Sequence, residues 1–323
     1  MPDPAHKAAD ASLDAFSGEI AELYQQAYID AVEELQKYLK GFEADDRLMR
    51  KKLASGELKQ SDYREWRRKQ MILNKRYRTI VKQMAEGATN ANKQAMDILA
   101  GRLPHIAAEN ANYAAYTIDK AIGMNTNFAL QDADTVAVML KEHGRYLPKP
   151  NLDIAKDMRW NRQLLSSALT KGILLGESIP KISKRVAEVI GGSIHGQVMR
   201  VARTCVTAAE NAGRIASYDR AESIGIELKK EWLATLDTRT RSSHRLLDGE
   251  QVANDETFSN GCEYPGDPNC DDYGEIANCR CTLVAAVEGV DQSNAARWSR
   301  LPDGMTYDEW KVAARRKNKK TPS

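Results

Sequence analysis

The sequence lacks any run of about 18 apolar residues, so it predicts no transmembrane helix. Its first ten residues, M-P-D-P-A-H-K-A-A-D, lack the apolar core of a signal peptide. Three frequent catalytic signatures are also missing: the nucleotide-binding motif G-x-x-x-x-G-K-[ST], the nucleophile elbow G-x-S-x-G and the zinc-protease motif H-E-x-x-H. The five cysteines are an odd number, which favours a chain made in a reducing cytosol rather than a secreted disulfide scaffold.

The bulk composition is that of an ordinary soluble globular protein, with 42% hydrophobic and 28% charged residues. A chain of 323 residues has room for one large domain or two ordinary ones, each able to bury a core. The net charge is only +2, which excludes a polycation as a whole. The positive charge is nevertheless concentrated, because residues 51–82 hold eleven Lys or Arg against three acidic residues. This local net charge of +8 leaves −6 for the rest of the chain.

Apolar residues spaced by three or four predict helices over most of the chain. From the N-terminus, the expected helices cover 11–40, 61–101, 104–122, 132–142, 153–171, 180–190 and 197–224. Gly41 is expected to end the first of these helices and Pro104 to begin the third. The patterns of 227–234 and 281–287 predict two short strands. The predicted fold class is therefore α+β and predominantly α-helical, with a long helical N-terminal region followed by helices and a small β-hairpin and loop module.

Two prolines mark a linker at 146–151, Y-L-P-K-P-N, because they disfavour helix and favour extended chain. We therefore expect a helical N-terminal region with the basic helix at 1–150 and a second, compact domain at 151–290. The polar and basic residues 291–323 are expected to form a flexible tail.

A first candidate site surrounds His244. Asp237 is a suitable N-cap for a short helix, and Asp248 with Gly249 a suitable stop. Asp237 and Arg241 are four residues apart and Arg241 and His244 three apart, which predicts that all three share one helical face. A carboxylate, a guanidinium and an imidazole gathered there would order a loop, hold a phosphate or hold a metal. Spacing alone fixes no catalytic partner for them.

A second candidate site is formed by cysteines. Cys279 and Cys281 are two residues apart, so on a strand both sulfur atoms point the same way. Together with Cys262, Cys270 and His244 they form a candidate zinc site, although zinc sites more often use the spacing C-x2-C. Two alternatives are buried free thiols and a disulfide that forms late between Cys262 and Cys270.

A third candidate site is the basic helix, in which Tyr63, Trp66 and Tyr77 alternate with cations. Cations and aromatic residues on one helix suit contact with a phosphate backbone without sequence readout. The alternatives are a solvated helix face and a surface that meets an acidic protein. The basic residues at 315–320 give the same ambiguous signal. The candidate DNA-binding residues are Arg64, Arg67, Arg68, Lys69, Lys75, Arg76 and Arg78.

The order of several motifs along the chain resembles the phage Mu F-like minor head protein family, also called the phage head morphogenesis family. The resemblance covers about 150–290, which would then be the Mu F-like head morphogenesis domain. No single motif is specific, but their order is. The motifs are Trp160, L-T-K-G-I-L-L-G-E-S-I at 169–179, Ala202-Arg203-Thr204, Asn211, Trp232, D-T-R-T-R-S-S-H at 237–244, L-D-G at 247–249, Phe258, Tyr264-Pro-Gly-Asp267 and N-C-R-C at 278–281.

This resemblance implies a minor capsid component of a tailed double-stranded DNA phage or a prophage, and no enzyme. The implied partners are the portal protein, capsid or scaffold proteins and non-specifically bound double-stranded DNA, with no membrane. The implied location is the host cytoplasm during assembly and then the interior of the virion head. The rival interpretation is a metal-dependent hydrolase that acts on nucleic acid through His244 and the cysteines. The motif positions carried over, without an assigned chemical role, are Asp237, Arg239, Arg241, His244, Asp248, Gly249, Asn278, Cys279 and Cys281.

Overall fold

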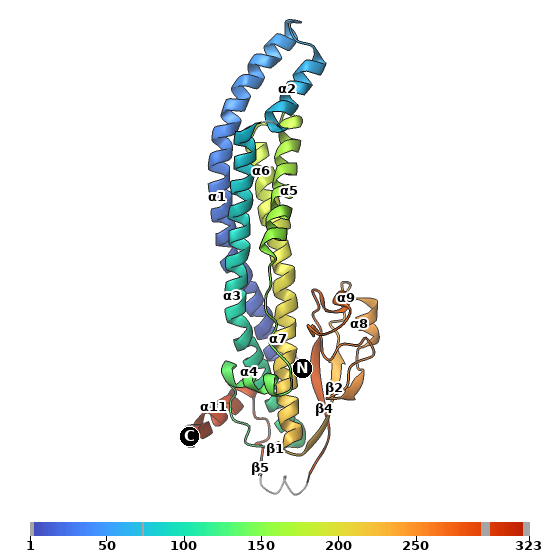
Figure 1. The fold of residues 1–323 in the computed structure, drawn as a ribbon. Helices are drawn as coiled ribbons and strands as arrows, with labels where there is room; N and C mark the ends of the chain where they lie inside the picture. Colours follow the sequence, from blue (N-terminus) through green and yellow to red (C-terminus); the bar gives the residue numbers. More distant parts are fainter. Residues whose placement is uncertain (1–2, 73, 292–297, 319–323) are drawn as a thin grey trace. The chain divides into compact units, whose positions relative to one another are not determined.

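The structure, a computed structural model, describes residues 3–72, 74–291 and 298–318 (Figure 1). Helices dominate it and the described strands are short and antiparallel, which confirms the predicted α-rich α+β class. No helix in this described part is both long and apolar enough to cross a bilayer. The helices are α1 (Pro4–Ala54), α2 (Gln60–Ile72), α3 (Lys75–Ile122), α4 (Ala133–Glu142), α5 (Ile154–Leu174), α6 (Ile179–Glu188), the π-helical turn η1 (Val189–Ile194), α7 (His195–Ser223), α8 (Ser242–Leu246), α9 (Tyr273–Ile276) and α11 (Tyr307–Asn318). The strands are β1 (Met124–Asn125), β2 (Ile226–Leu233), β3 (Gln251–Ala253), β4 (Thr282–Val290) and β5 (Ser299–Arg300).

Two predicted helix boundaries are wrong. Helix α1 continues through Gly41, and helix α3 continues through Pro104. Buried residues keep the helical spacing on both sides of each position, for example Leu39 and Phe42 in α1. This tertiary packing outweighs the low intrinsic helix propensity of glycine and proline.

The long helical region breaks instead beside Asn74. The side chain of Asn74 accepts hydrogen bonds from the backbone N–H groups of Arg76 at 2.9 Å and of Tyr77 at 3.3 Å. It thereby satisfies two of the donors that the first turn of α3 leaves without a helical partner. An asparagine that follows a helical pattern is therefore the signal for this helix start.

The chain forms two compact units, which differ from the expected domains divided near residue 150. Unit 1 comprises Met1–Ala15, Leu99–Pro150 and Arg200–Ser323, and unit 2 comprises Phe16–Ile98 and Asn151–Met199. Helices α1 and α3 each contribute residues to both units, so neither unit is continuous in sequence.

Unit 2 is a helical bundle (Figure 1). Hydrogen bonds between buried side chains form a polar network inside it. Asn92 of α3 donates hydrogen bonds to both carboxylate oxygens of Asp157 of α5, at 3.1 and 3.0 Å, and Asn161 donates to the same carboxylate at 3.0 Å. Tyr24 of α1 donates to Asn92 at 2.6 Å. Burial raises the pKa of Asp157. Because buried polar groups need partners, this network fixes how the three helices align with one another.

Unit 1 contains a three-stranded antiparallel sheet in the order β3-β2-β4. β2 pairs with β4 along its whole length, with Trp232 opposite Leu283. Both side chains are fully buried, together with Ile215 and Ala216 of helix α7. The two predicted strands are therefore the central strand β2 and the edge strand β4 of this small sheet, and α8 and α9 flank it (Figure 1).

The C-terminal residues differ from the flexible tail expected from their composition. β5 pairs with β1, and Trp310 of α11 is buried, with its indole N–H donating to Asp119 at 2.9 Å. Apolar residues at 307, 310 and 314 give α11 one buried face, which the high charge of the segment concealed. The side chains of the basic residues 316–320 lie outside the described part of the chain.

Candidate functional site

The candidate site is held on the sheet of unit 1 by the loop between β2 and β3. The backbone N–H of Gly249 donates to the Trp232 carbonyl at 2.8 Å, and Asp248 accepts the backbone N–H of Ala234 at 2.9 Å. Gly249 has a φ of +81°, which favours glycine. The L-D-G motif thus closes the loop and directs α8 over the sheet, where the His244 ring meets the Trp232 ring edge-on at 5.4 Å.

The second part of the site is the N-C-R-C segment, which precedes β4. Asn278 adopts a left-handed backbone conformation with a φ of +57°, which asparagine tolerates better than most residues. Two side chains of helix α7 donate hydrogen bonds to backbone carbonyl groups of this segment. The Thr207 hydroxyl donates to the Cys279 carbonyl at 2.7 Å, and the Asn211 side chain donates to the Cys281 carbonyl at 3.2 Å.

These two parts bring His244, Cys279 and Cys281 together, as the sequence predicted. Nδ1 of His244 lies 3.3 Å from Sγ of Cys281 and 3.6 Å from Sγ of Cys279. The three donor atoms all lie within 4.8 Å of one another. The three residues are buried, with relative exposures of 2%, 1% and 2% for His244, Cys279 and Cys281.

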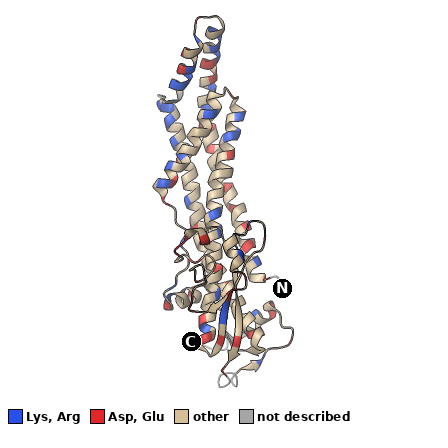
Figure 2. Ribbon diagram, turned by 90° about the vertical axis from the view of Figure 1, so that its right-hand side faces the viewer, with Lys and Arg blue, Asp and Glu red and all other residues tan. Residues whose placement is uncertain are grey.

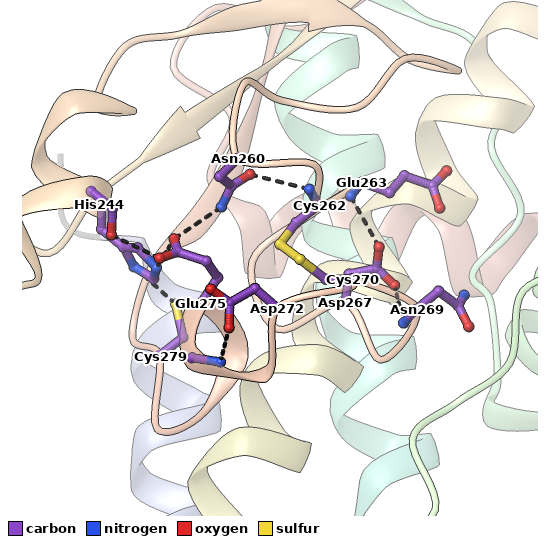
Figure 3. Close-up of a disulfide and its surroundings, with 12 residues drawn as sticks. His244, Asn260, Cys262, Glu263, Asp267, Asn269, Cys270, Asp272, Glu275 and Cys279 are labelled. Atoms are coloured by element: carbon purple, nitrogen blue, oxygen red, sulfur yellow. Dashed lines mark hydrogen bonds and ion pairs between the residues drawn. A yellow bond between two sulfur atoms is a disulfide. The ribbon is translucent and has the colours of Figure 1, made fainter.

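The other side of the imidazole faces Glu275 of α9, which sequence reasoning missed. Nε2 of His244 lies 3.2 Å from a carboxylate oxygen of Glu275, an ion-pair distance without hydrogen-bond geometry (Figure 3). The carboxylate is itself fixed, because Ser243 donates to it at 3.0 Å and Asn260 at 3.3 Å. Glu275 lies in a loop rich in Gly, Pro and Asp, where one more acidic residue gives no signal in the sequence.

The two thiols differ in acidity. Its hydrogen bond with the Cys279 thiol, and after it the nearby His244 imidazole, lower the pKa of Cys281 to about 4 against the opposing effect of burial. The same sulfur contact, together with burial, raises the pKa of Cys279. The contact between the two sulfur atoms therefore favours ionisation of Cys281 over ionisation of Cys279.

The predicted grouping of Asp237, Arg241 and His244 on one helical face is wrong. Helix α8 begins after Arg241, so Asp237 lies outside it. Asp237 instead forms a two-pronged ion pair with Arg280, at 2.5 and 2.7 Å, and this hydrogen bonding holds the pKa of Asp237 well below its usual range. Arg241 donates to the Ala277 carbonyl. Asp237 thus pairs with Arg280, which is distant in sequence, and not with Arg241, which helical spacing had suggested.

The remaining motif arginine, Arg239, is exposed and lies 3.8 Å from the Asp237 carboxylate. Its backbone N–H donates to the same carboxylate at 2.8 Å. Arg239 therefore helps to order the turn before α8 and takes no part in the buried cluster.

Cys262 and Cys270 form a disulfide, so they are not available as metal ligands (Figure 3). This corrects the five-residue metal site proposed from the sequence and leaves its other three members. The disulfide joins cysteines eight positions apart, and Asp267 orders the turn between them by accepting the backbone N–H groups of Glu263 at 3.0 Å and Asn269 at 2.8 Å. The third free cysteine, Cys205, is buried on α7 and lies outside the His244 cluster.

The basic region 51–82 lies at the end of unit 2 where α1 leads into α2, and Figure 2 shows many Lys and Arg positions, in blue, on the ribbon there. Two of its expected features are wrong. Arg67 is buried, donates to the Ile173 carbonyl and lies over the Phe42 and Tyr63 rings, so it is a core residue. Tyr63 and Tyr77 are buried as well, so they offer no stacking surface. The exposed candidate cations are Arg64, Arg68, Lys69, Lys75, Arg76 and Arg78.

Fold and site together define a class: a helix-rich protein whose small antiparallel sheet carries a buried histidine–thiol cluster beside a disulfide-closed loop. A family model described as Phage Mu protein F like protein matches residues 163–284. The chain is 30% identical to minor head protein GP7 of Bacillus phage SPP1 over 217 residues, which cover 62% of this chain and 67% of that protein. The chain therefore belongs to the phage Mu F-like minor head protein family.

A second relative carries a different name. The chain is 31% identical over 165 residues to NAD(+)--arginine ADP-ribosyltransferase EFV of Enterococcus faecalis (strain ATCC 700802 / V583). That match covers 50% of this chain but only 33% of the transferase, so the chain corresponds to about a third of that protein. No solved structure shows significant similarity to the chain.

Proposed function

We propose that this chain is a minor head protein of a tailed double-stranded DNA phage or prophage, incorporated into the capsid at the portal vertex. The observation that carries the proposal is its similarity to minor head protein GP7 over two thirds of that protein. The chain would be made in the host cytoplasm, join portal, capsid or scaffold proteins during assembly, and reside in the virion head.

Association with the portal is tested by co-expressing the chain with the portal protein of the same phage or prophage. We expect the two to elute together in size-exclusion chromatography after affinity capture of either one. The matched control is the portal protein of an unrelated phage, which is expected to elute separately. Separate elution of the cognate pair would contradict association at the portal vertex.

We further propose that the exposed cations of region 51–82 contact packaged DNA. The exposed cations lie on consecutive helices of one unit, and contact with phosphates needs no base-specific geometry. The burial of Tyr63 and Tyr77 favours binding to the backbone of a duplex over stacking on unpaired bases.

Replacing Arg64, Arg68, Lys75, Arg76 and Arg78 with Gln is expected to weaken duplex binding at least tenfold, because each neutralised phosphate contact contributes counterion release. The slope of log affinity against log salt concentration should decrease in magnitude by up to about 4.5, which is about 0.9 for each of the five cations. Fluorescence anisotropy over a salt series measures both quantities. Arg67 is left unchanged because it belongs to the core.

The matched control replaces five exposed cations elsewhere, so that the net charge changes equally; they are Lys7, Lys141, Lys149, Lys156 and Arg200. This control is expected to keep most of the affinity. Equal losses in the two variants would mean that only total charge matters and would remove region 51–82 as the DNA contact.

We propose a structural role and no enzymatic one. What supports it is the burial of His244, Cys279 and Cys281, since a hydrolytic centre has to admit its substrate. The name of the Enterococcus relative refers to a protein of which this chain matches a third. Cleavage of plasmid DNA by the purified chain, lost in His244→Ala, would favour the hydrolase instead.

A further inference from the structure

We propose that His244, Cys279 and Cys281 bind one zinc ion, through Nδ1 of the imidazole and the two sulfur atoms. Two thiolates and an imidazole are the ligand types that zinc prefers in proteins. The site would be structural, since its three protein ligands are buried. It goes beyond the proposed function, which needs no metal.

The two nitrogen–sulfur distances fit a single tetrahedral ion, and the two sulfur atoms lie within 4.8 Å of each other. Zinc–sulfur bonds of about 2.3 Å and zinc–nitrogen bonds of about 2.0–2.1 Å place neighbouring tetrahedral ligands about 3.5–3.8 Å apart. The nitrogen of His244 lies 3.3 and 3.6 Å from the two sulfur atoms, so an ion between them requires shifts of a few tenths of an ångström.

The surroundings select the histidine tautomer that such an ion needs. A carboxylate beside Nε2 favours a proton on that nitrogen, which leaves the lone pair of Nδ1 for the metal. Glu275 supplies this carboxylate 3.2 Å from Nε2, and Ser243 and Asn260 hold it in place. A carboxylate that accepts the N–H of a ligating histidine is its usual partner, and Glu275 would have to realign to accept it, since the present contact lacks hydrogen-bond geometry.

The backbone places the two sulfur atoms on the same side. Arg280 lies between Cys279 and Cys281 in sequence, and its side chain forms the ion pair with Asp237. The backbone N–H of Cys281 also donates to the Cys279 sulfur at 3.4 Å. Such N–H contacts stabilise a thiolate, which is the form that binds metal.

Charge balance favours a cation at this position. Binding would release the thiol protons to solvent, and two thiolates, a neutral imidazole and Zn²⁺ would then sum to zero net charge at the ligands, with the Glu275 carboxylate beside them. The ion would join α8 to the start of β4, which are 35 to 37 residues apart in sequence. Among the described residues no other Cys, His, Asp or Glu joins the cluster, so this part of the chain supplies three ligands.

The test begins with the wild-type chain, expressed and purified without added zinc or chelator. Elemental analysis is expected to give about one zinc per chain, and X-ray absorption at the zinc edge two sulfur neighbours at about 2.3 Å. Less than about half an equivalent of zinc, or a coordination shell without sulfur, would overturn the proposal. A disulfide between Cys279 and Cys281 in a zinc-free protein would overturn it as well.

Variants then assign the ligands. Cys281→Ser and Cys279→Ser are each expected to lose the zinc, whereas Cys205→Ser, which removes a buried thiol outside the cluster, should retain it. Glu275→Gln keeps all three ligands and should weaken zinc binding about 10- to 100-fold in a chelator competition. Equal zinc content in Cys281→Ser and wild type would show that the metal lies elsewhere. Because the absorption spectrum uses the wild type, the test holds even where a variant fails to fold.

Discussion

Replacing Arg214 with Met is expected to lower the free energy of unfolding by about 3 kcal/mol, because it removes the guanidinium that Asp3 and the buried Glu210 share and leaves His6 as the cationic partner of Glu210. Arg214 lies on α7 in the middle of unit 1, and its side chain is only 2% exposed. Its guanidinium donates to the Leu283 carbonyl of β4 at 2.8 Å, to Asn110 of α3 at 2.9 Å and to Asp3 at 2.5 Å. Glu210, on the preceding turn of α7, lies 3.4 Å away. One side chain therefore connects two helices, a strand and the N-terminal residues of unit 1.

Urea denaturation measures the change, and two further variants show its origin. Arg200→Met, at an exposed position of the same helix, is expected to change stability by less than about 0.5 kcal/mol. Glu210→Gln in the Arg214→Met background is expected to recover part of the loss, since it removes a buried negative charge. A loss below about 1 kcal/mol in Arg214→Met would show that the network contributes little.

The helices of this protein could be predicted because each has an apolar face of its own. α5 and α7 begin and end within a few residues of the positions expected from spacing and caps. The errors at Gly41 and Pro104 arose because local propensity was weighed without the packing that overrides it. The folded C-terminal segment was missed for the same reason, since the contact between Trp310 and Asp119 spans 191 residues.

The sequence was enough to predict which residue types form the candidate site, but not which side chains contact one another there. The proximity of His244 to Cys279 and Cys281 followed from assuming one compact module. The pairing of Asp237 with Arg280 did not follow, because 43 residues separate them and spacing rules reach only one or two helical turns. Glu275 was missed because its role depends on the position of a four-residue helix in an irregular loop.

Replacing Gly213 with Ala is expected to destabilise the protein by about 3 kcal/mol, although the same change inside most helices is stabilising. Gly213 is the weakest helix former in the middle of α7, and close packing explains its presence. A Cβ atom at this position would lie 2.1 Å from the backbone carbonyl oxygen of Ala107 on α3. One turn further along, the Ser217 hydroxyl donates to the Ala111 carbonyl at 2.6 Å, so the two helices stay in close contact. The clash is with backbone, which cannot rotate away, and the helices would have to separate.

Gly101→Ala on the partner helix is the matched control. A Cβ atom there meets nothing within 4 Å, so the variant should gain about 0.5–1 kcal/mol from helix propensity alone. Urea denaturation of both variants thus tests whether their changes in the free energy of unfolding differ in sign as well as in size. Stabilisation by both substitutions would mean that α3 and α7 are further apart than the structure places them. A loss confined to Gly213→Ala identifies the contact between these two helices as the reason why α7 contains a glycine at this position.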